Sequence, residues 1–316
     1  MPLERTPSSS SAMAAVKARL SGFETEAGRR AGLAFAPQPD DVFVVTTPKA
    51  GTTMMQTMAH ALRTGGDGSF GEISEEGVVP FVELAKDCDI DLDAQQPHPR
   101  LYKTHCWQPH CPKGARYIVV VRDPLDVAVS FYSFFNGWFF QPDEGISLDD
   151  FVAEFVLARG EPASDMQNAS YWHHLTSWWP RRNDADVLFL AYEDIVADKE
   201  RAVRRVADFI LPDSVKSNAE DLQRRVDAAI EMSSLQWMQR HPTKFDEHIT
   251  KIKRNAACGL PPDAGAGSGK VRAAGATRPT LSDAVVDALH KRWAEVVLPA
   301  TGCASYAELR ASLRGS

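Results

Sequence analysis

Residues 42–62 read VFVVTTPKAGTTMMQTMAHAL. The first five residues are β-branched or aromatic, which predicts a short buried strand. Pro48 ends this strand, and residues 54–62 have helix-forming composition after the candidate caps Thr52 and Thr53. A strand, a loop of small residues and a helix within about 20 residues form the arrangement of a phosphate-binding α/β unit.

The loop at residues 47–53 (TPKAGTT) has the composition of an anion site. Small residues let backbone N–H groups approach an anion, the helix start adds a partial positive charge, and Lys49 adds a full one. A phosphate-type group is the predicted occupant, and an ordinary strand-to-helix turn is the alternative. The segment most similar to the phosphate-binding loop of nucleoside triphosphatases is residues 265–271 (GAGSGKV). It has the wrong glycine spacing, and Val271 stands where that loop has the Ser or Thr that binds magnesium. An ordinary kinase or ATPase is therefore disfavoured.

The rest of the chain alternates between predicted strands and helices. Further strands are predicted at residues 100–104, 116–121 and 187–192, and helices at 13–30, 124–136, 148–158, 169–180, 199–210, 218–230 and 282–297. This order predicts a parallel sheet covered by helices on both faces. Residues 1–12 are expected to be a flexible tail, residues 13–316 a single α/β domain, and residues 254–278 a mobile loop within it.

Charge and composition exclude several classes of protein. The 316 residues include 35 Lys and Arg against 42 Asp and Glu, a net charge of −7. That balance argues against nucleic acid or an anionic membrane as the main partner. The five cysteines are an odd number at irregular spacing, which favours a reducing compartment. With no apolar run of membrane-spanning length and no signal-peptide pattern, we expect a cytoplasmic protein.

Residues 117–130 (YIVVVRDPLDVAVS) carry a second anion motif. A strand delivers Arg122 at its carboxyl end, Pro124 opens a helix, and Ser130 follows two turns later, where it can face the same ligand. An arginine there can hold a phosphate through two parallel hydrogen bonds. The alternative is an ion pair between Arg122 and Asp123 at the strand end, with Ser130 on the helix surface.

Together these motifs resemble the cytosolic sulfotransferases, which use 3′-phosphoadenosine 5′-phosphosulfate (PAPS). Residues 48–53 resemble the family's 5′-phosphosulfate loop, and residues 122–130 resemble its 3′-phosphate motif. The resemblance continues through residues 103–105 (KTH), 192–194 (YED) and 233–238 (SSLQWM), and spans roughly residues 35–300. It implies a sulfotransferase (EC 2.8.2) with a phosphosulfate-binding strand, loop and helix.

The resemblance also implies roles for individual residues. His105 would be the general base, with Lys49, Lys103 and Ser130 as further catalytic residues. Phe81 and Phe134, with Lys103 and His105, would contact the acceptor. The donor would be bound by Lys49, Ala50, Gly51, Thr52, Thr53, Met54, Arg122, Ser130, Tyr192, Ser234, Leu235, Arg272 and Gly275.

The chemistry of sulfuryl transfer explains these residue types. Positioning and charge stabilisation do most of the catalysis, through a loose in-line transition state. A cation at Lys49 would help adenosine 3′,5′-bisphosphate (PAP) to leave, and His105 could accept the proton of the attacking group. The predicted reaction is transfer to a hydroxyl or amine of a small organic acceptor, an alcohol, phenol or amine, with no metal.

Three alternatives remain at this stage. Residues 105–111 (HCWQPHC) offer two His and two Cys, but they lack typical zinc-site spacing. A carbohydrate sulfotransferase is the second, although such relatives are commonly membrane-anchored and this chain shows no anchor. The third is a catalytically silent nucleotide-binding module, against which the retained Lys49, Lys103, His105 and Ser130 argue.

Two segments depart from the family pattern. Met54 stands where the family usually has a tryptophan against the adenine, and residues 269–275 (GKVRAAG) only partly match its Arg-Lys-Gly segment, with Ala273 where lysine is expected. At Met54, stacking against the adenine is expected to be weaker or to be supplied elsewhere, and the partial match at residues 269–275 predicts weaker donor binding. The family's short dimer-forming motif is not evident either, so a monomer and a homodimer both remain open.

Overall fold

The computed structural model describes residues 7–94, 96–271 and 277–314. Arg272, Ala273 and Gly275, which the sequence analysis singled out, lie outside these residues. Four strands form one sheet in the order β2-β1-β3-β4, and every pair is parallel. Their bounds are β1 (Val42–Thr46), β2 (Leu101–Thr104), β3 (Arg116–Val121) and β4 (Val187–Ala191). The predicted parallel α/β domain is confirmed.

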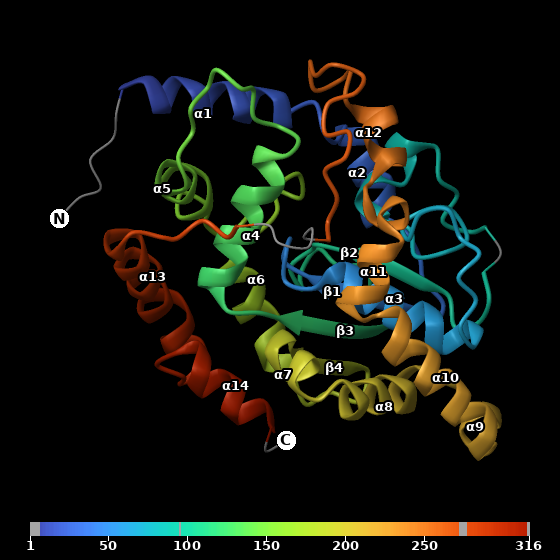
Figure 1. The fold of residues 1–316 in the computed structure, drawn as a ribbon. Coiled ribbons are helices and arrows are strands. Elements are labelled where there is room, and N and C mark those ends of the chain that lie inside the picture. Colours follow the sequence, from blue (N-terminus) through green and yellow to red (C-terminus); the bar gives the residue numbers. More distant parts are fainter. Residues whose placement is uncertain (1–6, 95, 272–276, 315–316) are drawn as a thin grey trace.

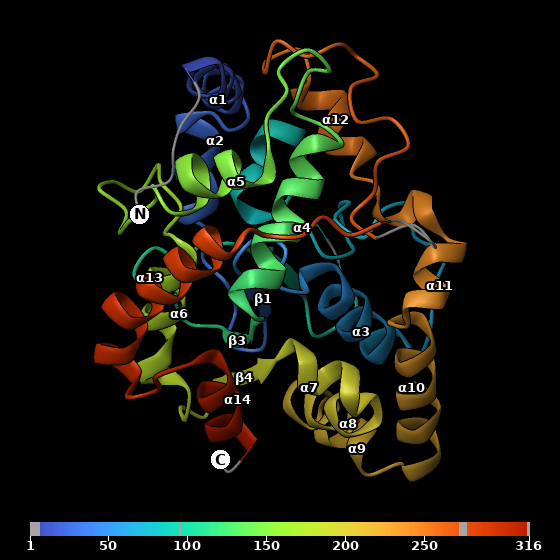
Figure 2. The ribbon, with the colours of Figure 1, turned by 60° about the vertical axis from the view of Figure 1, so that its left-hand side comes forward.

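Helices cover both faces of the sheet (Figures 1 and 2). One face carries α3 (Thr52–Thr64), α8 (Lys199–Ile210) and α10 (Ala219–Met232), and the other carries α1 (Pro7–Leu20), α4 (Pro124–Asn136), α6 (Tyr171–Trp178) and α13 (Asp283–Thr301). Alternate residues of one strand serve the two faces: Val44 is buried with the first group, and Phe43 and Val45 with the second. Both faces are therefore apolar, as the continuous apolar strands predict.

The remaining elements are short. They are α2 (Glu26–Leu33), η1 (Val82–Leu84), η2 (Lys86–Cys88), α5 (Leu148–Phe151), the π-helical turn η3 (Val152–Val156), η4 (Trp179–Arg181), α7 (Tyr192–Ala197), α9 (Asp213–Lys216), α11 (Leu235–Arg240), η5 (Pro242–Phe245), α12 (His248–Arg254) and α14 (Tyr306–Arg314). The segment 148–158 is thus α5 and a π-helical turn instead of one helix. Beyond α12, residues 255–271 contain no helix or strand, as predicted.

The start of the chain differs from the sequence-based prediction. Residues 7–12, expected in a flexible tail, form the first turns of α1, which buries Met13 and Val16 against the core. The helix expected over residues 13–30 is two helices, α1 and α2. At Gly22 between them, a Cβ atom would lie 2.0 Å from the Ala257 carbonyl oxygen. The close packing of Gly22 against a loop far along the chain therefore explains the break between α1 and α2. Helical periodicity in the sequence does not predict this break.

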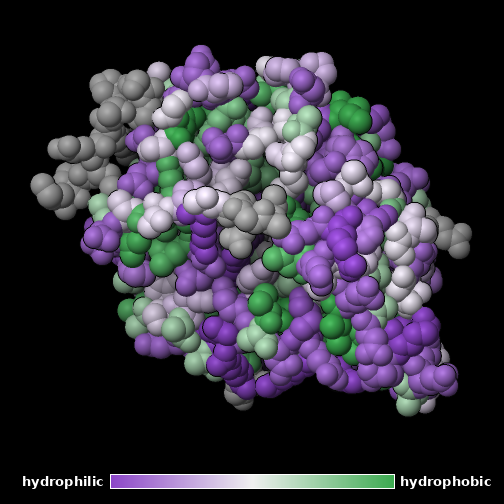
Figure 3. Space-filling view, viewed as in Figure 1, coloured by the Kyte–Doolittle hydropathy of each residue, from purple (hydrophilic) through white to green (hydrophobic). Residues whose placement is uncertain are grey.

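Figure 3 shows hydrophilic side chains over most of the visible face, with apolar ones in small separate groups. Among the described residues, no helix combines the length and the apolar character needed to cross a bilayer.

Candidate active site

A cavity of about 1270 Å³ lies where the loops after the parallel strands meet. Because all four strands run the same way, the loops that follow Thr46, Thr104, Val121 and Ala191 gather at one edge of the sheet. The predicted site residues that line the cavity are Lys49, Gly51, Thr52, Thr53, Met54, Phe81, Lys103, His105, Arg122, Ser130, Phe134, Tyr192, Ser234 and Leu235. Ala50 lies behind the wall, buried, and its N–H donates to the Thr47 carbonyl at 3.2 Å.

The loop after β1 is a tight turn into α3. Lys49 has a φ of 71° and Gly51 a φ of 103°, both in the left-handed region. A Cβ atom on Gly51 would lie 2.6 Å from the Tyr192 ring, so this position needs glycine for both conformation and space. The first N–H groups of α3 have no acceptor within the helix. Thr52 and Thr53, which line the cavity, carry two of them toward an anion site.

Among the cationic side chains that line the same cavity, Lys49, Lys103, Arg122 and Lys270 lie close enough to influence one another. Burial, and then the charges of the other three, lower the pKa of Lys49 to about 7, although Glu247 opposes the shift. Burial and Lys270 lower the pKa of Lys103 to about 8. The two amines also rest on aromatic rings, Lys49 Nζ 4.3 Å from the centre of the Phe134 ring and Lys103 Nζ 4.0 Å from that of Phe81. An anionic ligand would relieve this mutual repulsion.

Glu247 is the buried counterion of this cluster, and the sequence analysis missed it. Its Oε1 lies 3.5 Å from Lys103 Nζ and forms a closer ion pair with Lys270. The lysines hold the pKa of Glu247 at about 2 despite its burial. Lys270 lies in the segment that resembles the family's Arg-Lys-Gly motif, so this segment could have identified Lys270 as a site residue. Nothing in the local sequence marks Glu247, because Lys103 is more than 140 residues away.

His105 follows β2 and is held by two hydrogen bonds. Its ring Nδ1 lies 2.8 Å from the Thr46 carbonyl oxygen, and its backbone N–H donates to Glu83 Oε1 at 2.7 Å. A carbonyl oxygen only accepts, so Nδ1 carries the proton and Nε2 keeps its lone pair. Burial and Lys103 hold the pKa of His105 well below its ordinary value. The ring is therefore neutral and can act as a base through Nε2.

Arg122 joins the two predicted anion motifs. Its Nη1 donates to the Lys49 carbonyl at 3.2 Å, its guanidinium lies 4.5 Å from the centre of the Tyr192 ring, and its Nε is buried without a hydrogen-bond partner. Its side-chain ion pair is with Asp126 at 3.3 Å, so the expected alternative of a pair with Asp123 is wrong. Ser130 lies on the same wall, two turns into α4.

Lys199, which the sequence analysis did not single out, lies beside Met54. Its Nζ is 3.1 Å from Met54 Sδ and donates to the Ser233 carbonyl at 3.2 Å. Burial lowers its pKa to about 8. Ser234 caps α11 by accepting from the Trp237 N–H at 3.1 Å, and Leu235 is exposed on the cavity wall. A lysine and a thioether thus stand where the family pattern has an aromatic ring.

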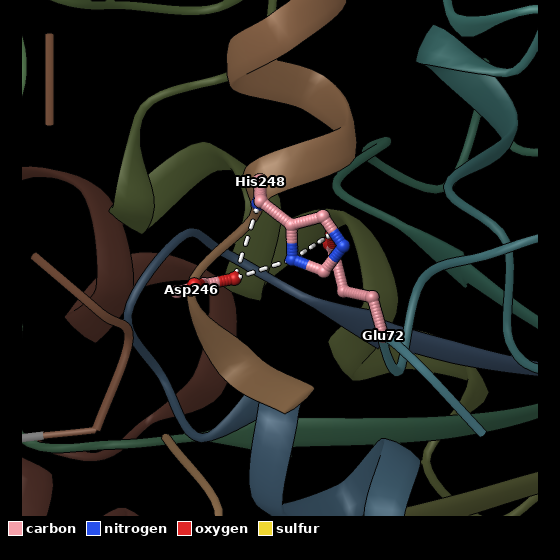
Figure 4. Close-up of side chains that lie close together, drawn as sticks. All are labelled: Glu72, Asp246 and His248. Atoms are coloured by element: carbon pink, nitrogen blue, oxygen red, sulfur yellow. Dashed lines mark hydrogen bonds and ion pairs between the residues drawn. The ribbon is translucent and has the colours of Figure 1, made fainter. Parts of the chain in front are cut away.

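Glu72, Asp246 and His248 form a neighbouring polar group at the start of α12 (Figure 4). Among the described residues, this is the group of His, Cys or acidic side chains whose ligand atoms, all within 4.8 Å, could hold a metal. His248 Nδ1 donates to Asp246 Oδ1 at 2.7 Å, and Glu72 Oε2 accepts from the Ile249 N–H at 3.0 Å. These bonds fix the first turn of α12, directly after Glu247. The zinc alternative at residues 105–111 gains no support, since none of them belongs to such a group.

Comparisons with known proteins show the family of this chain. The profile of the sulfotransferase domain family matches residues 39–272. Bovine sulfotransferase 1A1 is 30% identical over 228 residues, 66% of this chain and 69% of the relative. Human sulfotransferase 1E1 is 31% identical over 227 residues, 66% and 70% of the two chains.

The fold is also similar to that of a solved enzyme, retinol dehydratase. Retinol dehydratase in complex with androsterone and the inactive cofactor PAP superposes with a TM-score of 0.58 at 19% identity, covering 93% of this chain and 95% of that one. Its complex with retinol and PAP gives a TM-score of 0.55 at 18% identity, covering 94% of each chain. The family match over most of the chain carries the assignment: this chain belongs to the sulfotransferase family, enzymes that depend on PAPS.

Proposed function

We propose that the chain transfers a sulfuryl group from PAPS to a hydroxyl or amine of a small organic acceptor, with His105 as the general base. The hydrogen bond from His105 Nδ1 to the Thr46 carbonyl, at 2.8 Å, carries this proposal. It leaves Nε2 free to accept a proton, in a cavity lined by both cations and aromatic rings. Lys49 and Lys103 would stabilise the negative charge that develops during transfer.

The cavity wall has the right chemistry for the donor. The turn at Gly51, Thr52 and Thr53 would hold the 5′-phosphosulfate, and Arg122 with Ser130 would hold the 3′-phosphate. Tyr192, Met54, Ser234 and Leu235 would surround the adenine. The retinol dehydratase structures, which share the fold, contain PAP together with androsterone or retinol, which supports a donor site beside a site for a small apolar acceptor.

Lysines and backbone dipoles supply the positive charge here, so we propose that the reaction needs no metal. Turnover that persists after treatment with a strong chelator would agree with this, and turnover restored only by added magnesium would contradict it. The five cysteines are buried and unpaired in the structure, which supports the proposal of a reducing, cytoplasmic location. A monomer or a homodimer is proposed as the oligomeric state.

Replacement of His105 by alanine tests the central step. We expect a loss of turnover on the order of 10²–10⁴, measured with labelled PAPS and a library of alcohols, phenols and amines, as for removal of a general base. Calorimetric affinity for PAP should stay within a few-fold, because the donor contacts remain. His290→Ala, which changes an exposed histidine of α13, is the matched control and should retain full activity.

Two outcomes would contradict the proposal. Full activity of His105→Ala would remove the histidine from the mechanism, and a wild-type protein that does not bind PAP would exclude PAPS as the donor. Binding of PAP without turnover of any acceptor would favour the silent nucleotide-binding module.

A further inference from the structure

Arg159 lines the same cavity as His105 but comes from a different part of the chain. It follows the π-helical turn η3, whereas His105 follows β2. Figure 1 shows α5, which leads into this turn, on the opposite side of α4 from β2. The cavity wall between the two regions is largely aromatic and includes Phe134 and Phe139. An acceptor that reaches both residues would therefore need an apolar body.

The guanidinium of Arg159 has no acidic partner. It lies 4.1 Å from the centre of the Phe155 ring, and it has no side-chain hydrogen bond or ion pair within the described part of the chain. The nearest carboxylate that affects it, Glu24, is itself paired with Arg29 at 2.8 Å. Glu161 also lines the cavity but is exposed and contributes nothing to the pKa of Arg159. One positive charge therefore remains uncompensated at this end.

Arg159 is half-buried at the cavity wall, and its unpaired N–H donors are accessible to a ligand. Burial lowers the pKa of Arg159 to about 10, which still leaves the side chain charged at neutral pH. A guanidinium presents five N–H donors in a planar fork, and a carboxylate offers two oxygens in the matching geometry. The guanidinium lies over the ring of Phe155, and its N–H groups, which have no acceptor among the described residues, are available to a ligand.

We propose that the acceptor is amphiphilic: an apolar body that presents a hydroxyl to His105 and carries a carboxylate at its other end, held by Arg159. This rests on the proposed function for the hydroxyl end. The uncompensated arginine would select hydroxylated aromatic or alicyclic acids as acceptors over their neutral counterparts.

Binding measurements test the inference without turnover. The probes are phenylalkanoates with one to six methylene groups between ring and carboxylate, each paired with its primary amide, in the presence of saturating PAP. Calorimetry should show one chain length at which wild type binds the acid about 10-fold or more tightly than the amide, as expected for a charge-assisted pair. Equal binding of acid and amide at every length would overturn the inference.

Substitutions of Arg159 test whether the preference for acid over amide depends on this residue. Arg159→Gln should abolish the acid preference and change amide binding by less than about 3-fold, and Arg159→Lys should keep part of it. Arg116→Gln is the matched control, because Arg116 also rests on a phenyl ring, 4.5 Å from that of Phe209, but lies outside the cavity. An acid preference that survives in Arg159→Gln would also overturn the inference.

The two proposals can fail separately. Turnover of hydroxyphenylalkanoates of the same lengths tests sulfuryl transfer, whereas the dissociation constants of the unreactive acids test the role of Arg159. An enzyme that sulfates phenols but ignores the carboxylate would retain the proposed function and reject this inference.

Discussion

Lys49, Lys103, Arg122 and Lys270 share the proposed donor site with one buried carboxylate, Glu247. Lys49 and Lys103 are held partly by Glu247 and partly by aromatic rings, so their charges repel each other until an anion arrives. Their protonation state is therefore coupled to ligand binding, because an anion favours the charged amine.

This coupling predicts proton uptake when PAP binds. The pKa of Lys49 in the free protein is about 7, so near pH 7.5 a large fraction of the amine is neutral. The bound anion raises that pKa, and on the order of half a proton should be taken up. PAP affinity should accordingly fall as the pH rises above 7. Calorimetry at pH 7.5 in phosphate and Tris buffers measures the uptake, and an enthalpy independent of the buffer would contradict it. At pH 6, where the amine is already charged, the uptake should disappear.

Replacement of Glu247 by glutamine should destabilise the protein. The change leaves Lys103 and Lys270 buried without a counterion, which lowers the free energy of unfolding by about 3–5 kcal/mol. The pKa of Glu247 lies below its ordinary 4.5, so its contribution is present above that value and fades as the pH falls toward 2. Urea unfolding at pH 7 measures the loss, and saturating PAP should recover part of it.

The control for this variant is Asp213→Asn. Asp213 is almost fully exposed and pairs with Lys216 at 2.9 Å, so its loss should change stability by less than about 1 kcal/mol. Equal stabilities for Glu247→Gln and wild type would mean that the buried carboxylate is not a structural counterion.

At the scale of elements, the strand-loop-helix at β1 and α3 shapes the proposed donor site. Its turn combines a left-handed Lys49 and a left-handed Gly51 against the Tyr192 ring. The strands that are apolar on both faces and the helices with capping residues could be predicted from the sequence, because the residue patterns that mark them are local. The break at Gly22 between α1 and α2, and the ion pairs of Glu247, could not, because each depends on residues far along the chain.

Gly51→Ala should weaken donor binding more than it weakens the fold. The backbone at φ 103° disfavours any side chain, by about 1–3 kcal/mol, and the new methyl group would meet the Tyr192 ring. Gly302→Ala is the matched control, because Gly302 has a φ of 75° but open space around it, at the end of α13. Both variants should lose thermal stability, and only Gly51→Ala should lose PAP affinity. Equal PAP affinities for the two variants would contradict a special role for this turn.

At the scale of the whole molecule, most of the predicted donor residues and all of the predicted acceptor residues line a single cavity. Its wall includes residues from Leu20 to Arg278, which is why the predicted single domain holds the site. The aromatic residues between α4 and η3 illustrate what sequence leaves open. The resemblance predicted Phe134 at the acceptor, and only the fold shows that Phe139 and Phe155 also line the cavity.

A shared cavity predicts sequential kinetics. Both substrates must be bound together for the acceptor to reach the sulfuryl group beside His105, so double-reciprocal plots of initial rate should intersect. PAP should compete with PAPS and not with the acceptor. Parallel lines would indicate a sulfuryl-enzyme intermediate and would contradict direct transfer.

The sheet order β2-β1-β3-β4 also has a consequence for how the chain acquires its shape. β1 pairs with β2 and β3, whose residues lie roughly 60 to 75 positions away in sequence, and β4 follows still later. Parallel pairing over such separations is slow, because long loops must close before any contact forms. Glu247 and Lys270 come later again. During synthesis, the central strands can meet long before the donor pocket closes, so the binding of PAP should be among the last properties that the newly made chain gains.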